Sequence, residues 1–398
     1  MMSMKRIVFI AAILALLPLS SEAQKKGKAA EIEPYRFETL IENPVTSVKD
    51  QASSGTCWCF SAISFIESEI LRATGEEYDL SEMFVVSNAY YDKALKYVRM
   101  HGHLNFSPGS SFSDVLAVLE TYGIVPERVM PGLNYGTDRH LHFEMDEVLK
   151  GIVTALVKNP NQKLSTAWKR GFRDMTAAYL GDIPEYFGVG GVQYTPESFM
   201  DSLGIDLEDY VDISSWTHHP FYEPMVIEVP DNWRGRCAWN VPLDEMIAII
   251  DNAIENGYTV AWASDVSEDG FTGAGVAVVP DVTKTFEGSD QKHWIGSQEV
   301  GGKPLFTLTP CPEMVITQEM RQEGFDDYST TDDHGMHIFG KAVDQNGTEY
   351  YMVKNSWGKV GPYEGVWYVS KAYVKYKTTD IVVNKKAIPS EIREKFNL

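Results

Sequence analysis

An α+β fold is predicted from three features of this 398-residue sequence. The front half carries amphipathic helical stripes, whereas the part after Tyr258 carries β-branched and aromatic runs bounded by Gly, Asn and Asp. A helical front half followed by a strand-rich back half is typical of α+β chains. The composition, with 44% hydrophobic and 23% charged residues, excludes intrinsic disorder and is sufficient for a large core.

The helices are predicted from their apolar spacing and their glycine stops. From Cys57, apolar side chains at positions 58, 62, 65, 66 and 70 form one stripe that ends at Thr74-Gly75. Residues 113–122 and 241–256 repeat this pattern. The expected organisation is a signal at 1–23, an N-terminal arm at 24–45, a helical lobe at 46–132, an inserted, mostly helical subdomain at 133–212, a return to the helical lobe at 213–257, a β-rich lobe at 258–385 and a C-terminal arm at 386–398.

The charge balance limits the partners of the protein. A formal net charge of −21 argues against nucleic acid and anionic membranes, because binding to either depends on Lys and Arg to replace counterions. Four cysteines in a chain of this length do not make a disulfide scaffold. Whether Cys237 and Cys311 pair is left open by the sequence.

A secretory signal is predicted at the N-terminus. Lys5 and Arg6 precede an apolar run from Ile7 to Leu17, and cleavage is expected after Ala23. A membrane span needs about 20 apolar residues, and this run is shorter. The mature protein is therefore expected in the periplasm or the extracellular space, with no membrane contact after cleavage.

A reactive thiol is predicted at Cys57. This residue follows Gly55-Thr56 and begins a helix, whose N-terminal partial positive charge favours a thiolate. Cys59 lies two residues into the helix and is expected to serve in packing. Gln51 is expected to turn its amide donor toward the same point and to form, with the Cys57 N–H, an oxyanion hole.

The general base is predicted to be His337, from a hairpin that follows it in the sequence. Residues 337–343 and 349–355 alternate like strands around Asn346-Gly347, a strong hairpin signal. This pairing brings Asn355 almost opposite His337, where its amide can orient the imidazole toward the thiolate. His334 is expected to lie beyond the end of the pairing. Trp357 is expected to cover the Asn–His contact.

These residues resemble the papain-like cysteine peptidases in type and in chain order. Gln51, Cys57-Trp58, His337 and the run Asn355-Ser-Trp-Gly carry the resemblance. In ordinary members the catalytic Cys and His are about 130 to 150 residues apart, and the stretch between Cys57 and His337 is about twice as long. The surplus, together with Ser53-Ser54-Gly55 and the tail 382–391, resembles the bleomycin hydrolase/aminopeptidase C branch.

The resemblance implies a two-lobed fold, with the Cys57 helix in a helical lobe and His337 and Asn355 in a β-rich lobe. It also implies a peptidase that acts on peptides without a cofactor or a metal. In this branch the terminal carboxylate receives the free amine of the substrate, a role that would fall to Leu398, and the enzymes are homo-hexamers. Aminopeptidase action follows from that anchor. Relatives in this branch are mostly intracellular, in contrast to the signal predicted here.

Three alternatives stay open at this point. A papain-like endopeptidase would share the same catalytic residues, and an inactive papain-fold binding protein would share the fold. An acyl-transferring Cys-His-acid enzyme is disfavoured by Asn instead of Asp at position 355. No metal site is expected, since the pairs His101/His103 and His140/His142 lack nearby Cys or a helical His-x-x-x-His spacing. His218-His219 is expected to pack near a loop.

Overall fold

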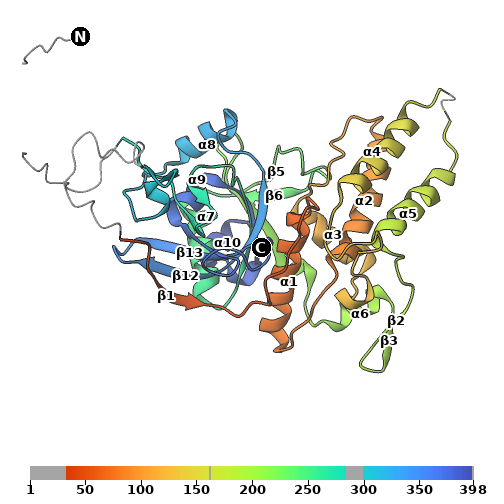
Figure 1. Cartoon of the computed structure of the whole chain (residues 1–398), viewed down its shortest axis with the longest axis horizontal. Helices are drawn as coiled ribbons and strands as arrows, with labels where there is room; N and C mark the ends of the chain where they lie inside the picture. The colour runs from red at the N-terminus through yellow and green to blue at the C-terminus, as the bar shows by residue number, and fades with distance from the viewer. Residues whose placement is uncertain (1–32, 161–162, 284–298, 397–398) are drawn as a thin grey trace, which may run out of the picture. The chain divides into compact units, whose positions relative to one another are not determined.

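From Pro34 onward, one part of the chain is mostly helical and another is built on a large sheet (Figure 1), and each has a large hydrophobic core. The computed structural model describes residues 33–160, 163–283 and 299–396. The predicted signal, 1–23, and the first part of the N-terminal arm lie outside these residues. Within the described ranges, no helix is both long and apolar enough to cross a membrane.

The first core is formed by helices. Local sequence sets their ends: Gly75 stops the first helix with a left-handed φ of 77°, and the Ser81 hydroxyl caps the second by accepting the N–H of Phe84. Leu149 and Phe172, from the segment expected to be an insertion, are fully buried in the same core. The helices of this lobe are α1 (Cys57–Thr74), α2 (Glu82–Arg99), α3 (Phe112–Tyr122), α4 (Phe143–Val157), α5 (Ala167–Leu180) and α6 (Pro196–Ser202).

The second core lies on a large mixed sheet. Its strands follow the order β5-β6-β4-β15-β7-β12-β13-β14-β9-β8, and β1 pairs with β12. Helices α7 (Leu243–Glu255), α8 (Gln318–Asp326), α9 (Lys371–Lys377) and α10 (Ser390–Phe396) belong to this lobe. The strands are β1 (Phe37–Glu42), β4 (Tyr210–Ser214), β5 (Pro224–Val226), β6 (Cys237–Asn240), β7 (Val260–Ser264), β8 (Phe271–Thr272), β9 (Val276–Ala277), β12 (His334–Asp344), β13 (Glu349–Lys354), β14 (Val366–Ser370) and β15 (Thr378–Asn384); the small pairs are β2 (Phe187–Val189) with β3 (Val192–Tyr194) and β10 (Glu299–Val300) with β11 (Lys303–Pro304).

The structure corrects the expected place of residues 213–257. They were expected in the helical lobe, but β4, β5 and β6 join the large sheet, and the apolar stripe of α7 packs in the sheet core through Met246, Ile250 and Ile254. An amphipathic helix buries its apolar face against whichever surface the chain brings to it, and here that surface is the sheet. The end of the N-terminal arm likewise becomes β1 on the edge of β12.

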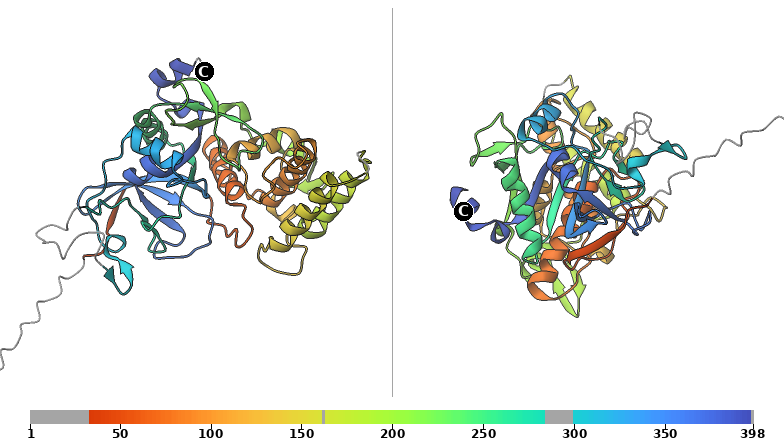
Figure 2. Two further views of the ribbon diagram at one scale, coloured as in Figure 1. Left: turned by 90° about the horizontal axis from the view of Figure 1, so that it is seen from above. Right: turned by 90° about the vertical axis from the view of Figure 1, so that its left-hand side faces the viewer.

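Helix α1 lies between the sheet and the other helices of the first lobe (Figure 2). It packs against β12 and β7 on one side and against α2 and α3 on the other. A strand that ends beside the N-terminus of α1 can therefore present its side chains to Cys57. This arrangement sets the position of the site.

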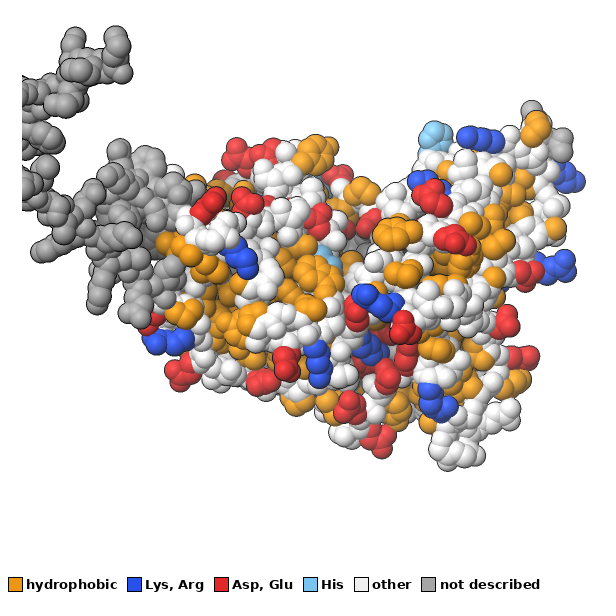
Figure 3. Space-filling model, viewed as in Figure 1, with side chains coloured by type: hydrophobic (Ala, Val, Ile, Leu, Met, Phe, Trp, Pro, Cys, Tyr) orange, Lys and Arg blue, Asp and Glu red, His pale blue; other side chains and the backbone are white. Residues whose placement is uncertain are grey.

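The surface and the cysteines add two observations. On the face seen in Figure 3, Lys and Arg side chains are scattered among acidic and apolar ones. All four cysteines, which lie within the described ranges, are free thiols. Cys237 is exposed and Cys311 is partly buried, so the open question of their pairing is answered: they do not form a disulfide in this structure.

Candidate active site

A tight loop positions Cys57 as the first residue of α1. Ala52 and Gly55 adopt positive φ values of 49° and 64°, and a Cβ at position 55 would lie 2.8 Å from Pro108. Only glycine combines that conformation with that close approach. The first turn of α1 has no acidic residue, so the partial positive charge of the helix end is left for the partly buried Cys57.

The surroundings of Cys57 favour its neutral thiol in the free protein. Burial raises the pKa of Cys57 to about 11, and the carboxylates of Asp332 and Asp231 act in the same direction. Backbone N–H groups of Gly335 and Trp58 oppose this rise in pKa because they stabilise the thiolate. A reaction at Cys57 therefore needs a group that takes its proton.

His334 is the histidine that lies in the pocket with Cys57. Its Nε2 lies 2.8 Å from Oδ1 of Asn355, which also accepts the N–H of Ser356. Oδ1 is therefore an acceptor, His334 Nε2 carries the proton, and Nδ1 is left with its lone pair. The Trp357 ring stacks on His334 at 4.7 Å between centroids. Burial lowers the pKa of His334 to about 4, so the ring is neutral and can accept a proton.

The structure contradicts the assignment of the base to His337. This side chain is fully buried beneath α1, where its Nδ1 lies 2.8 Å from the hydroxyl of Ser64, and it does not line the pocket. The hairpin exists, but Gly340 pairs with Met352 while Ile338 pairs with Val353. A bulge thus shifts the register.

The bulge explains the error in the hairpin argument. Phe339 is an extra residue on β12, so His337 pairs with Lys354 rather than Asn355. Asn355 follows the end of β13 and turns its amide to His334. The sequence contained a signal for the bulge, because an isolated glycine inside a strand, here Gly340, often marks one.

Two groups were predicted to form the oxyanion hole, the backbone N–H of Cys57 and the side-chain amide of Gln51. The structure places them differently. The N–H of Cys57 belongs to the first turn of α1, whose N–H groups have no partner within the helix. The amide of Gln51 is anchored, because its Oε1 accepts the hydroxyl of Ser356 at 2.6 Å. This bond leaves the Nε2 end of Gln51 as a donor. Gln51 does not line the pocket that contains Cys57.

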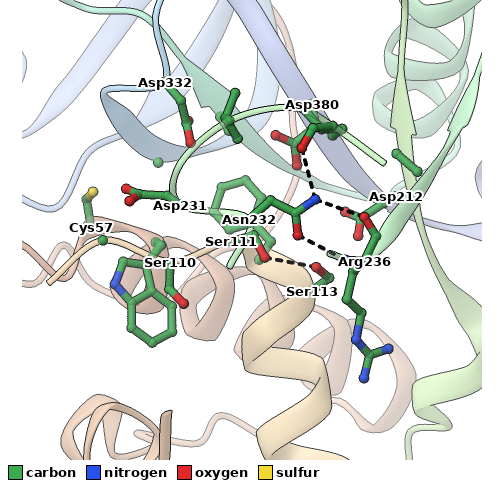
Figure 4. A pocket seen from close by; sticks show the side chains of 18 of the residues that line it. Cys57, Ser110, Ser111, Ser113, Asp212, Asp231, Asn232, Arg236, Asp332 and Asp380 are labelled. Atoms are coloured by element: carbon green, nitrogen blue, oxygen red, sulfur yellow. Dashed lines mark hydrogen bonds between the residues drawn. The ribbon is translucent and has the colours of Figure 1, made fainter. Parts of the chain in front are cut away.

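The pocket beside Cys57 has an acidic lining (Figure 4). Sequence reasoning missed these carboxylates because they come from four separate segments, although Asp332-Asp333 immediately precede His334. The anchor predicted at Leu398 lies outside the described residues. Carboxylates lining the pocket are Asp212, Asp231, Asp332, Asp333 and Asp380, and Arg236 is the one Lys or Arg among the lining residues.

The described residues contain one group with metal-ligand geometry. His218, His219 and Glu228 offer ligand atoms within 4.8 Å of one another. Nδ1 of His218 is held by Gln322 at 3.0 Å. This group does not line the Cys57 pocket, and no step at Cys57 needs it.

Comparisons with known proteins relate the chain to cysteine peptidases. Residues 34–99 match the papain family cysteine protease model, and residues 314–398 match the Peptidase C1-like family model. The chain is 21% identical over 389 residues to Aminopeptidase C of Listeria monocytogenes, covering 88% of this chain and 82% of that protein. It is 23% identical over 413 residues to Aminopeptidase C of Lactococcus lactis subsp. cremoris, covering 94% and 87%.

A solved structure shares the fold. The crystal structure of PepW from Lactobacillus rhamnosis superposes with a TM-score of 0.65 at 21% identity, covering 90% of this chain and 84% of that one. The two family models cover the Cys57 segment and the segment with His334 and Asn355. The chain is thus similar to the papain-like cysteine peptidases in two segments, and to Aminopeptidase C proteins over most of its length.

Proposed function

We propose that this protein is an exported aminopeptidase that removes N-terminal residues from peptides, with Cys57 as nucleophile and His334 as base. The observation that carries this proposal is the arrangement around one pocket: a thiol at a helix N-terminus, and a neutral histidine held by Asn355 and Trp357. Aminopeptidase C relatives align over most of the chain, which favours removal of N-terminal residues over internal cleavage.

The proposed reaction begins with the Cys57 thiol and the His334 imidazole both uncharged. Nδ1 of His334 takes the thiol proton as Sγ of Cys57 attacks the scissile carbonyl carbon, so charge develops on the carbonyl oxygen. The N–H of Cys57 and the free Nε2 end of Gln51 are the donors proposed for that oxygen. The imidazolium then protonates the leaving amine, and the acyl–sulfur bond is hydrolysed by a water that His334 deprotonates.

Asn355 and Trp357 position the base. The bond from Nε2–H of His334 to Asn355 Oδ1 fixes the tautomer that leaves Nδ1 free for the thiol proton. The Trp357 ring covers one face of the imidazole and keeps water from competing for this bond. Neither residue touches the reacting atoms, so each acts through His334.

The direct test compares hydrolysis of an aminoacyl fluorogenic amide with that of its N-acetyl twin. We expect cleavage of the free-amino substrate, inhibition by iodoacetamide, and loss of turnover in Cys57→Ala. Cys59→Ala is the matched control, because this second thiol of α1 is fully buried. Activity that survives in Cys57→Ala would refute the assignment. Preference for the N-acetyl twin or for internal bonds would instead favour the endopeptidase.

The export proposal rests on the basic start and the apolar run from Ile7 to Leu17. Mass spectrometry of protein purified from its native host should give an N-terminus at Gln24. A chain that keeps Met1 and stays in the cytoplasmic fraction would refute export while leaving the peptidase assignment untouched.

The hexamer expected from the branch is a separate proposal. The molar mass of the same purified sample, measured by light scattering, tests it.

A further inference from the structure

Two carboxyl groups in the pocket beside Cys57, those of Asp231 and Asp332, have no direct contact with a Lys or Arg side chain among the described residues. Among the described residues, neither Asp231 nor Asp332 has a Lys or Arg nitrogen within 4.0 Å. In Figure 4 the guanidinium of Arg236 points away from both carboxylates. Buried acids normally have a paired cation or several hydrogen bonds, because an isolated buried charge is costly.

Asp231 is fixed in place by its neighbours. Its Oδ1 accepts from Asn105 at 3.1 Å and from Ser107 at 3.3 Å. Its Oδ2 packs over Gly109, where the Cβ of any other residue would lie only 1.8 Å away. The position of this carboxylate therefore depends on glycine at 109. Buried Lys93 lies behind the same loop and donates to the carbonyl of Ser107 at 2.8 Å. Burial raises the pKa of Asp231, and the charge of Lys93 opposes this rise without a direct contact.

Asp332 faces Asp231 across the pocket near Cys57 (Figure 4). The hydroxyl of Thr379 donates to its Oδ1 at a long 3.4 Å. Burial, followed by the charges of Asp380, Asp231 and Asp333, raises the pKa of Asp332 well above its usual value. A cation between Asp332 and Asp231 would lower the pKa of both groups, because it stabilises both ionised carboxylates.

The far end of the pocket also has an unsatisfied acceptor. Oδ1 of Asp212 is buried and has no hydrogen-bond partner among the described residues. Asp380, only 8% exposed, lines the same end. Burial raises the pKa of Asp212 to about 7 and that of Asp380 to about 8, and in Figure 4 both lie on the side of the pocket away from Cys57. The carboxylates near Cys57 are the better placed ones for a substrate cation.

The geometry of nucleophilic attack also places the positively charged α-nitrogen of the substrate near Cys57. In the attacking complex the scissile carbonyl carbon lies about 3 to 3.5 Å from Sγ. The α-nitrogen of an N-terminal residue is two bonds from that carbon, so it must lie close to Cys57. Asp231 and Asp332 are also the two carboxylates that raise the pKa of the Cys57 thiol through their charge, which places both within electrostatic range of Sγ.

We propose that Asp231 and Asp332 form the binding site for the α-ammonium group of the substrate's N-terminal residue. This inference rests on the proposed function and specifies how the site selects a free N-terminus. The helix that leads to Leu398 does not supply this contact in the described residues. Phe396 stacks on Trp239, whereas Ala238, its neighbour in β6, lines the pocket from the opposite face of the strand.

Ammonium binding would also activate the nucleophile. Burial is the main reason that the Cys57 thiol is neutral, and the charges of Asp332 and Asp231 add to this effect; the added part would be compensated once the substrate ammonium is bound. Proton transfer from Cys57 to His334 then becomes easier only in the complex. The expected kinetic result is that loss of either carboxylate raises KM for free-amino substrates and also lowers kcat.

The test uses isosteric variants Asp231→Asn and Asp332→Asn of the full chain, with thermal unfolding to verify folding. Four substrates separate the sources of positive charge: an alanyl amide, its N-acetyl twin, an N-acetyl-lysyl amide and an N-acetyl-norleucyl amide. We expect each variant to lower the preference for the alanyl amide over its N-acetyl twin by roughly tenfold or more. Glu228→Gln is the matched control, since this exposed acid lies between two pocket residues but does not line the pocket.

Gly109→Ala provides a second route that changes no charge. Its new methyl group must displace the Asp231 carboxylate, so the preference for free amines should fall in the same direction. Unchanged preference in folded Asp231→Asn and Asp332→Asn, with turnover still dependent on Cys57, would overturn the inference and leave the proposed function intact. A loss confined to the N-acetyl-lysyl amide would also overturn it, because the site would then bind a side chain.

Discussion

Two histidines on one strand, three residues apart, have opposite surroundings. His334, at the start of β12, lies in the pocket with Cys57 and is held by Asn355 and Trp357. His337 points beneath α1, has no exposed surface and contacts Ser64 and Phe65. Because side chains three positions apart in a strand point to opposite faces, one of them can act on a substrate and the other belongs to the core.

The difference shows that burial alone does not mark a functional histidine. Burial lowers the pKa of both rings, to about 4 for His334 and well below the usual range for His337. What separates them is the partner of each ring: an orienting amide beside a cavity for His334, and a hydroxyl of a packed helix for His337. The predictions below test this division.

The largest effect is expected from His334→Ala. Loss of the base should lower kcat by about 10²- to 10⁴-fold without a comparable loss of stability. His337→Ala is the matched variant on the same strand, and it should lose stability through an unfilled buried site while the folded fraction keeps most of its turnover. Single-turnover kinetics together with thermal unfolding measure both. An inactive but stable His337→Ala beside an active His334→Ala would reverse the comparison.

Asn355→Ala is expected to cause the second largest effect. A hydrogen bond to a group that becomes charged contributes about 1.5 to 3 kcal/mol, which corresponds to a loss of about 10- to 100-fold in kcat. Because Asn355 acts through His334, adding Asn355→Ala to His334→Ala should cause little further loss. Additive losses in the double variant would show that Asn355 has a separate role.

The pH dependence of stability sharpens the role of His337. Its pKa is lowered in the folded protein, so below pH 6.5 the unfolded chain binds a proton that the folded chain does not. Stability should therefore fall as pH drops below about 6.5, by at most about 1.4 kcal/mol per pH unit for this group. In His337→Gln the acid-side fall should be shallower, as chemical denaturation at pH 5 to 7 can measure. Parallel curves for the two proteins would contradict this account.

Ser64→Ala is expected to have the smallest effect. It removes the hydroxyl that contacts Nδ1 of His337, a bond that contributes about 1 kcal/mol. Unfolding in urea should show this loss, and kcat should stay within twofold of the parent, roughly the scatter of such measurements. A large change in kcat with intact stability would mean that the core histidine communicates with the pocket.

The sequence predicted those features that depend on local pattern. The helix at Cys57 follows from its apolar stripe and its Gly75 stop, and the hairpin follows from Asn346-Gly347. The pairing of residues 340–343 with 349–352 agrees with the count from that turn. The papain-like fold was also predicted, because residue type, order and context agree at several positions.

Tertiary structure decided what local pattern does not encode. The extra residue at Phe339 changes the register between the turn and the site, so the partner of Asn355 depended on a bulge. The placement of α7 against the sheet, and the meeting of Asp231 with Asp332 beside Cys57, depend on contacts between segments far apart in the chain. Periodicity shows which residues share a face of one element, whereas the surface facing them is set by packing of the whole chain.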